Sequence, residues 1–395
     1  MAPPEGFSLI HPTPISPGHS LRLQKALYGL KQSGRSWNVT ITEFLTGAGF
    51  TRCLVDPCIY TRKSAKSLIA IVLYVDDLLI ASDSRHALNS FKKELSDRFR
   101  IKDLRPTTHI LGIKVTRNRS AKTISLDQET FIRSITERFN LTNAAPVSTP
   151  LPSGFIPTTK DSPTTDADIA EMKKRPYLQA LGMVMFAMIA TRPDICYSVG
   201  VLSRFSSNPG PKHWKALQYL IRYLASSASK TLVYRNLNGQ AHITTFTDSD
   251  FAADPDTRHS TSGYTLLING TAIAWSSRRQ RVTTTSTAEA EYTALAAGIQ
   301  ELIWANQVLY TLGAPQERPL VVYSDNQAAI FMAKNPSINA ATKHIDVKLH
   351  FIRDFITDGL IDVRYIPTAS QLADLLTKPI PRDRHLELTT SLGLN

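Results

Sequence analysis

Two groups of acidic residues in this chain have the types and spacing that suit metal-dependent phosphate chemistry. The first is an adjacent pair, Asp76 and Asp77, inside the run SLIAIVLYVDDLLIAS. The second is a set of acids that lie far apart in the chain, at predicted strand ends or in predicted helices: Asp248, Glu291, Asp325 and Asp374. Carboxylates that converge repel one another and raise each other's pKa values, whereas Mg²⁺ prefers oxygen ligands and relieves that repulsion. Both groups are therefore candidate cation sites.

The adjacent pair lies between two apolar runs, residues 68–74 and 78–81, which predict two strands joined by a tight turn. Continuous apolar runs are typical of strands that are buried on both faces. Two unpaired carboxylates buried at such a junction would cost several kcal/mol, and a divalent cation would remove that cost. The alternative is a solvated Asp-Asp hairpin turn, because turns favour Asp.

Strands and helices in the last 155 residues or so would have to bring the four separated acids together. Alternation and apolar runs predict strands at 242–247, 264–268, 271–276, 320–323 and 361–365. Helices are predicted at 287–312, 327–333 and 347–357, and a last helix that includes Asp374 from near residue 370. Asn269-Gly270 predicts a two-residue hairpin between the second and third strands. Asp248 and Asp325 then each follow a strand.

The long helix offers two acids, Glu289 and Glu291, and a local pattern separates them. Ser286-Thr287-Ala288-Glu289 has the form of a capping box, which gives Glu289 a structural role at the helix N-terminus. Glu291 lies about 200° further around the helix. We therefore predict that Glu291 reaches the strand ends.

The composition is that of a globular protein with a basic surplus. The chain has 395 residues, of which 42% are hydrophobic and 20% charged, and its formal net charge is +12. A surplus of this size points to a polyanionic partner such as nucleic acid, although a merely basic globular protein is the alternative. Three cysteines cannot form a disulfide framework. No apolar run is long enough to cross a bilayer, so no membrane partner is expected.

Several motifs carry a resemblance to a known family. YVDD between two apolar strands resembles the palm hairpin of reverse transcriptases, and LQKALYGLKQSGRSWN (23–38) resembles a segment characteristic of copia-type retrotransposons. GFTRCLVDPCIY (49–60), THILGIKV (108–115), TRPDICYSVGVLSRF (191–205) and HWKALQYLIRYL (213–224) are similar to later segments of the same Pol polyproteins, in the same order. The distal strand and helix order resembles the ribonuclease H fold, and AEYTAL resembles its catalytic Glu segment. The chain thus resembles the C-terminal reverse transcriptase and ribonuclease H portion of a copia-type Pol polyprotein.

The resemblance implies an α/β (α+β) chain with a particular division. Residues 1–142 would be a partial palm and thumb that lacks the fingers and the first catalytic strand, and residues 143–170 a connector rich in Pro, Ser and Thr. Residues 171–239 would form a helical connection segment. Residues 240–395 would form a ribonuclease H-like domain with a mixed five-stranded sheet and flanking helices.

The resemblance also assigns roles to residues. Asp76 and Asp77 would bind metal in polymerisation, and Asp248, Glu291, Asp325 and Asp374 would be the metal-binding, catalytic acids of the ribonuclease H site. Each site would use two Mg²⁺ ions, with Mn²⁺ as a substitute. Nucleic-acid contacts are expected from Lys31, Gln32 and Arg35 near the template and nucleotide, and from Arg278, Arg279 and Arg281 on backbone phosphates.

The implied partners are an RNA/DNA hybrid, a template RNA with its primer, and the other Pol segments: integrase, protease and the rest of the palm and fingers. The family has a further catalytic Asp on an upstream palm strand, and the residues before Leu21 contain no Asp. We therefore expect this chain alone to have lost polymerase activity and to retain ribonuclease H. Two alternatives remain: a non-enzymatic nucleic-acid-binding remnant of a retroelement, and an unrelated two-metal phosphatase or nuclease.

Overall fold

The structure is a computed structural model that describes residues 20–152, 154–236, 239–335 and 346–395. The chain divides into two compact units. The first comprises residues up to Asp103 together with Thr311–Gly313, and the second comprises Leu104–Tyr310 and Ala314–Asn395. In the described part of the chain, no helix combines the length and apolar character needed to span a membrane.

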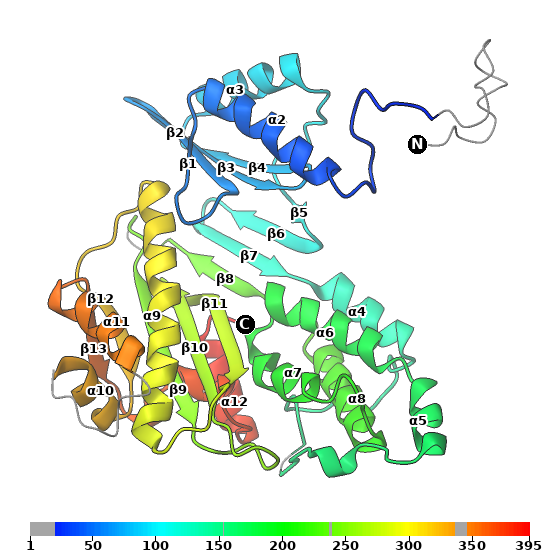
Figure 1. Ribbon diagram of the computed structural model, residues 1–395. Coiled ribbons are helices and arrows are strands. Elements are labelled where there is room, and N and C mark those ends of the chain that lie inside the picture. The colour runs from blue at the N-terminus through cyan, green and yellow to red at the C-terminus, as the bar shows by residue number, and fades with distance from the viewer. Residues whose placement is uncertain (1–19, 153, 237–238, 336–345) are drawn as a thin grey trace. The chain divides into compact units, whose positions relative to one another are not determined.

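The first unit is an antiparallel sheet packed against two helices. Its strands are β1 (Thr51–Arg52), β2 (Ile59–Ser64), β3 (Ser67–Tyr74) and β4 (Asp77–Ser82), in the order β1-β2-β3-β4. Helices α2 (Ser33–Gly47) and α3 (Arg85–Arg98) bury Ile41, Leu45, Phe91 and Leu95 against that sheet. Both helices and all four strands appear in blue and cyan in Figure 1.

The expectation that β3 is buried on both faces is wrong. Ile69, Ile71 and Leu73 are buried under the helices, whereas Val72 is 40% exposed and Tyr74 is 54% exposed. The reason is that successive side chains of a strand point to opposite faces, and the helices of this unit cover only one of them. An unbroken apolar run cannot reveal that difference.

The second unit begins with a four-stranded sheet and a helical layer. The sheet has the order β5-β6-β7-β8, formed by His109–Ile110, Ile113–Asn118, Thr123–Asp127 and Leu232–Arg235. The helices are α4 (Glu129–Arg138), α5 (Asp166–Lys173), α6 (Tyr177–Ala190), α7 (Cys196–Ser203) and α8 (Pro211–Ser226), with a 3-10 turn η2 at Pro193–Ile195. The expected boundary at residue 142 falls inside this unit, because Ile132 and Ile135 of α4 share one core with α6 and α8.

The distal part is a five-stranded mixed sheet of the predicted kind. Its strands are β9 (Ile243–Asp250), β10 (Thr261–Ile268), β11 (Thr271–Arg279), β12 (Leu320–Ser324) and β13 (Ile361–Tyr365), in the order β11-β10-β9-β12-β13. β9, β10 and β11 are antiparallel, whereas β12 runs parallel to both β9 and β13. Asn269 (φ 49°) and Gly270 (φ 82°) form the predicted turn, which needs two residues with positive φ. The mixed α/β fold class is therefore confirmed.

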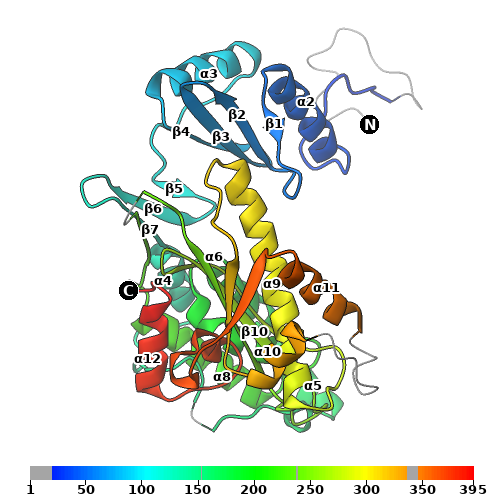
Figure 2. The same ribbon diagram turned by 90° about the vertical axis from the view of Figure 1, so that its left-hand side faces the viewer.

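Helices cover both faces of this distal sheet. Helices α9 (Thr287–Thr311), α10 (Gln327–Lys334) and α11 (Asp346–Thr357) lie over one face, and their core includes Leu266, Val322 and Val363. The 3-10 helix η5 (Leu372–Leu376) and helix α12 (Arg382–Ser391) pack on the other face, against Phe246 and Leu267. Figure 2 shows α9 and α12 on opposite sides of the strands.

The last helix differs from the prediction. A continuous helix was expected from near residue 370, but the structure has the short η5 and then α12 from Arg382. Pro379 and Pro381 lie between them. Proline lacks the backbone N–H that a helix interior requires and its ring clashes with the preceding turn, so one helix cannot run through both residues. Asp374 is consequently held on a 3-10 turn.

Gly298 sets how closely α9 approaches β9, and a prediction follows from it. A Cβ at residue 298 would lie 2.4 Å from Cγ2 of Thr247, so Gly298→Ala should lower the free energy of unfolding by about 1–3 kcal/mol through overpacking. Gly182 in α6 is the matched control, because its added Cβ would meet no described heavy atom within 4 Å. Gly182→Ala should instead stabilise by up to about 1 kcal/mol, as alanine does in helices. Denaturant unfolding measures both, and stabilisation by Gly298→Ala would contradict the close contact.

Candidate metal centre

Three of the predicted acids meet at one edge of the distal sheet. β9 and β12 are neighbouring parallel strands, with Tyr323 paired to Phe246, so Asp248 in β9 and Asp325 just after β12 extend from the same edge. Glu291 comes from the first turns of α9. Carboxylate oxygens of Asp248, Glu291 and Asp325 all lie within 4.8 Å of one another. Asp248 is 3% exposed, Glu291 is 6% exposed, and Asp325 is half-buried.

Asp374 lies beside this group of three and is paired with a lysine. Its Oδ1 is 2.6 Å from Nζ of Lys378, and the same Nζ is 3.8 Å from Oδ2 of Asp248. Asp374 is outside the set of acids whose oxygens approach within 4.8 Å. The four predicted acids thus converge as three neighbouring carboxylates plus Asp374, which is linked to Asp248 through the ammonium group of Lys378.

Hydroxyl groups hold two of these carboxylates, and a buried amide holds the segment of η5 beside them. Thr377 Oγ1 donates a hydrogen bond to Oδ2 of Asp248, and Thr368 Oγ1 donates one to Oδ2 of Asp325 at 2.7 Å. The buried Gln371 donates from Nε2 to the backbone oxygen of Thr247 at 3.0 Å, which ties the segment of η5 to β9. None of these residues was identified from the sequence, although the four-residue spacing of Asp374 and Lys378 is a usable signal for an ion pair.

The contacts of Glu289 agree with the prediction that this residue caps the long helix. Oε2 of Glu289 accepts hydrogen bonds from the backbone N of Thr285 at 2.7 Å and from its Oγ1 at 2.9 Å. Ser286 Oγ accepts from the backbone N of Glu289 at 3.2 Å. Glu289 therefore caps the start of α9, while Glu291 is directed to the strand ends. The reciprocal partner is Thr285, one residue earlier than in the standard box.

The electrostatics of the group favour a cation. Burial raises the pKa of Glu291 to about 9, and the charges of Asp248 and Asp325 add to that rise. Burial also raises the pKa of Asp248, although the Lys378 ammonium opposes the shift. Oε2 of Glu291 is buried without a hydrogen-bond partner among the described residues. Buried acids that repel one another and leave an oxygen unused fit a divalent cation.

The raised pKa of Glu291 predicts how stability depends on pH in the absence of metal. Between its ordinary pKa of 4.5 and about 9, the folded state holds a proton that the unfolded chain has lost. The contribution of Glu291 to the free energy of unfolding therefore falls as the pH rises through this window. Glu291→Gln removes that fall, so in EDTA its melting temperature should rise relative to wild type between about pH 6 and about pH 8.

Mg²⁺ should remove this difference by raising the melting temperature of the wild type, because a bound cation stabilises the ionised carboxylate of Glu291. Thermal melting of both proteins with EDTA and with Mg²⁺ is the measurement. A melting-temperature difference that does not change with pH in EDTA would contradict the burial of an ionisable Glu291.

The three arginines next to this site differ in their surroundings. Arg278 and Arg279 end β11, and Arg281 follows it. Arg279 pairs with the buried Asp254 at 2.7 Å, and Arg204 pairs with the same carboxylate at 3.0 Å. Burial would raise the pKa of Asp254, but these two arginines and backbone N–H groups outweigh it and lower that pKa. Asp254 is thus a structural anchor held by two arginines, whereas Arg278 and Arg281 are exposed.

The first unit places its predicted site residues on an open surface. Val75 and Asp76 form the turn between β3 and β4, and both Asp76 and Asp77 are exposed. Lys31, Gln32 and Arg35, near the start of α2, are exposed as well. In the part of the chain that the structure describes, no third acid joins Asp76 and Asp77 in a group that could hold a metal.

Trp37 supports that turn. Its Nε1 donates to the backbone oxygen of Val75 at 2.6 Å, and its ring packs edge-on against Phe99 at 5.4 Å. The ring of Trp37 therefore belongs to the edge of the hydrophobic core of the first unit.

Comparison with known proteins identifies the family. Residues 1–153 match the family model described as reverse transcriptase (RNA-dependent DNA polymerase). The chain is 40% identical over 386 residues to the retrovirus-related Pol polyprotein from transposon TNT 1-94 of Nicotiana tabacum. The aligned region covers 97% of this chain but only 28% of that relative. A transposon Ty5-1 protein of Saccharomyces cerevisiae is 30% identical over 289 residues, which span 73% of this chain and 91% of that relative.

A solved ribonuclease H1 in complex with an RNA/DNA hybrid aligns with 34% of this chain and 93% of its own, at a TM-score of 0.27 and 17% identity. The fold class depends on the strand order of the distal sheet and on the helices that cover both of its faces. The similarity to these relatives establishes the family. The chain belongs to the retrovirus-related Pol polyproteins of copia-like transposons and corresponds to their reverse transcriptase portion.

Proposed function

We propose that this chain hydrolyses the RNA strand of RNA/DNA hybrids at the site formed by Asp248, Glu291, Asp325 and Asp374. The observation that carries the proposal is the convergence of three carboxylates within 4.8 Å, two of them buried, with Oε2 of Glu291 left without a partner. Such a group is costly unless cations bind to it. Membership of the Pol family makes a nucleic-acid phosphodiester the expected substrate.

Asp248, Glu291 and Asp325 would hold the principal cation, and Asp374 with Asp248 a second one. Mg²⁺, for which Mn²⁺ can substitute, would activate water and stabilise the leaving oxygen in an in-line displacement. The residues of the chain supply the positioning. Thr377 and Thr368 hold the carboxylates of Asp248 and Asp325 in place through hydrogen bonds, so little reorganisation is needed when charge develops.

The exposed arginines beside the site would contact the phosphate backbone, and this gives a testable prediction. Arg278→Ala and Arg281→Ala should each weaken hybrid binding in a sequence-independent way and lower the slope of log affinity against log salt by about 1. Arg133→Ala is the control, because Arg133 is an exposed arginine on α4 paired with Glu129. Fluorescence anisotropy at several salt concentrations is the measurement, and unchanged slopes would contradict the contacts.

The pair Asp76 and Asp77 supports a role in polymerisation only together with further acids. Both are exposed on the β3–β4 turn, and no third described acid joins them. Two metals cannot be held properly by one hairpin, so we expect this chain alone to synthesise no DNA. Template RNA, a primer and other Pol segments are the proposed partners of the first unit. The division into palm and thumb, connector, connection segment and ribonuclease H-like domain likewise stays a proposal.

The test is cleavage of a labelled RNA strand within an RNA/DNA hybrid. Wild-type protein should cut it in Mg²⁺ and leave it intact in EDTA, and Asp325→Asn should be inactive in both conditions while binding the hybrid. Wild-type protein that binds the hybrid in Mg²⁺ without cutting would contradict the proposal. It would favour the alternative of a non-enzymatic binding remnant.

A further inference from the structure

Lys378 is, among the described residues, the basic residue whose ion-pair contacts reach the acid cluster. Its Nζ lies 2.6 Å from Oδ1 of Asp374 and 3.8 Å from Oδ2 of Asp248. Its charge also acts on Asp250 and Asp325. A single ammonium group therefore occupies the side of Asp248 that faces Asp374.

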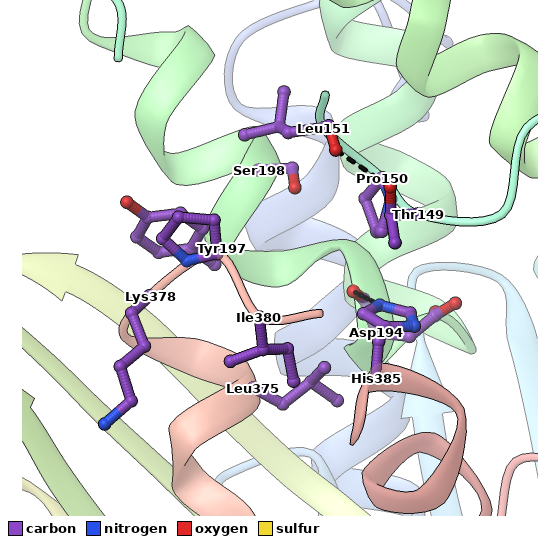
Figure 3. A pocket seen from close by; sticks show the side chains of 11 residues that line it. Thr149, Pro150, Leu151, Asp194, Tyr197, Ser198, Leu375, Lys378, Ile380 and His385 are labelled. Carbon is purple, nitrogen blue, oxygen red and sulfur yellow. Dashed lines mark hydrogen bonds between the residues drawn. The ribbon is translucent and has the colours of Figure 1, made fainter. Parts of the chain in front are cut away.

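The chain holds Lys378 in this position through its neighbours. The preceding Thr377 donates its hydroxyl to Asp248, and the backbone N of Lys378 donates to the backbone oxygen of Asp374 at 3.4 Å. The stem of Lys378 borders a cavity of about 20 Å³, room for a single water, together with Tyr197 and Leu375. Figure 3 shows the lysine side chain extending away from the other labelled residues of that cavity. The side chain is 38% exposed, so it can move out without unfolding its surroundings.

The two sides of Asp248 are consequently unequal. On one side, Glu291 and Asp325 face it, and Oε2 of Glu291 has no partner among the described residues. On the other side, the ammonium group of Lys378 already lies 2.6 Å from Oδ1 of Asp374. A divalent ion that enters the first side approaches three carboxylates, whereas an ion that enters the second side must displace or repel an ammonium group.

We propose that the Lys378 ammonium holds the place of a second cation between Asp248 and Asp374. The free protein then binds one divalent ion tightly, at Asp248, Glu291 and Asp325, and a second one only weakly. This inference rests on the proposed function, because it assumes that the acid cluster binds metal. It assigns to Lys378 the role of a positioning residue that controls the order in which the two ions enter.

The experiment is a titration of the metal-free full chain with Mn²⁺, followed by calorimetry and by electron paramagnetic resonance, without any substrate. Lys378→Met removes the charge and keeps an unbranched stem, and Lys378→Arg keeps the charge. Lys215→Met is the matched control, because Lys215 is an exposed lysine of α8 away from the cluster. Lys378→Gln serves as a second neutral variant if Lys378→Met does not fold, as judged by circular dichroism.

Wild type, Lys378→Arg and Lys215→Met should each bind one Mn²⁺ tightly. Lys378→Met should bind a second ion with an affinity raised about tenfold or more, the effect of removing one like charge at this distance. Two tight ions on wild type, or an unchanged second affinity in both neutral variants, would overturn the role of Lys378 while leaving the metal site intact. The absence of any bound Mn²⁺ in all proteins would overturn the proposed function as well.

Discussion

Glu291→Gln is expected to reduce the rate of Mg²⁺-dependent RNA-strand cleavage by about a thousandfold, which corresponds to about 4 kcal/mol of lost transition-state stabilisation. The substitution keeps the size and hydrogen-bonding capacity of the side chain and removes only its charge. Glu291 is the most strongly perturbed acid of the cluster, because burial and two neighbouring carboxylates act on it together. A cation held at the cluster would lose one of its three nearest charges. Single-turnover cleavage of a labelled hybrid, at saturating Mg²⁺, measures the effect.

Glu301→Gln is the matched control for this experiment. Glu301 lies on the same helix, α9, and accepts a hydrogen bond from the hydroxyl of Tyr264 at 3.1 Å, away from the acid cluster. The cleavage rate of Glu301→Gln should stay within about threefold of wild type, because substitutions away from a site have small effects. Equal losses in the two variants would mean that Glu291 acts through the stability of α9. A rate within tenfold of wild type in Glu291→Gln would contradict its place in the site.

Asp194→Asn is expected to lower the free energy of unfolding of the second unit by about 3–5 kcal/mol. Asp194 and Arg192 are both buried and form a two-bond ion pair, with Nη2 to Oδ2 at 2.7 Å and Nε to Oδ1 at 2.9 Å. Tyr223 donates its hydroxyl to the same carboxylate at 2.6 Å. The amide would leave the guanidinium group of Arg192 buried without a balancing charge, and that desolvation is the source of the loss.

The appropriate control is an exposed ion pair of the same unit. Glu129→Gln breaks the contact between Glu129 and Arg133 on α4, whose side chains are 37% and 60% exposed, and should cost less than about 1 kcal/mol. The double variant Arg192→Met/Asp194→Asn should be more stable than Asp194→Asn alone, because it leaves no unpaired buried charge. Denaturant unfolding followed by circular dichroism gives these values. A cost below about 1 kcal/mol for Asp194→Asn would contradict the buried pair.

Arg192 and Asp194 also connect the helical layer to the segment that carries Lys378. Nε2 of His385, in α12, lies 3.4 Å from the backbone oxygen of Asp194 in η2. Burial lowers the pKa of His385, although the charge of Asp194 opposes that shift. The motif TRPD, noticed in the sequence only as a family resemblance, thus has a structural basis in a buried charge pair.

The sequence determined features that depend on neighbouring residues. The Asn269-Gly270 turn follows from the preference of that dipeptide for positive φ, and the separation of Glu289 from Glu291 follows from capping within one helical turn. The order of the distal strands and helices also followed from periodicity, and the fold class followed from the resemblance of that order to a known fold. These features are local because turn, cap and alternation preferences operate over a few residues.

Tertiary structure decided which charges meet and which faces are covered. Periodicity does not specify that β3 is covered on one face only, that Asp254 is buried between Arg204 and Arg279, or that two prolines place Asp374 on a short 3-10 turn. The contact of Lys378 with Asp248 joins residues that are more than a hundred positions apart in the chain, and the meeting of Asp248, Glu291 and Asp325 joins a helix and two strands that are tens of residues apart. Such contacts arise from sheet register and core packing, which bring distant segments together and which no short-range pattern encodes.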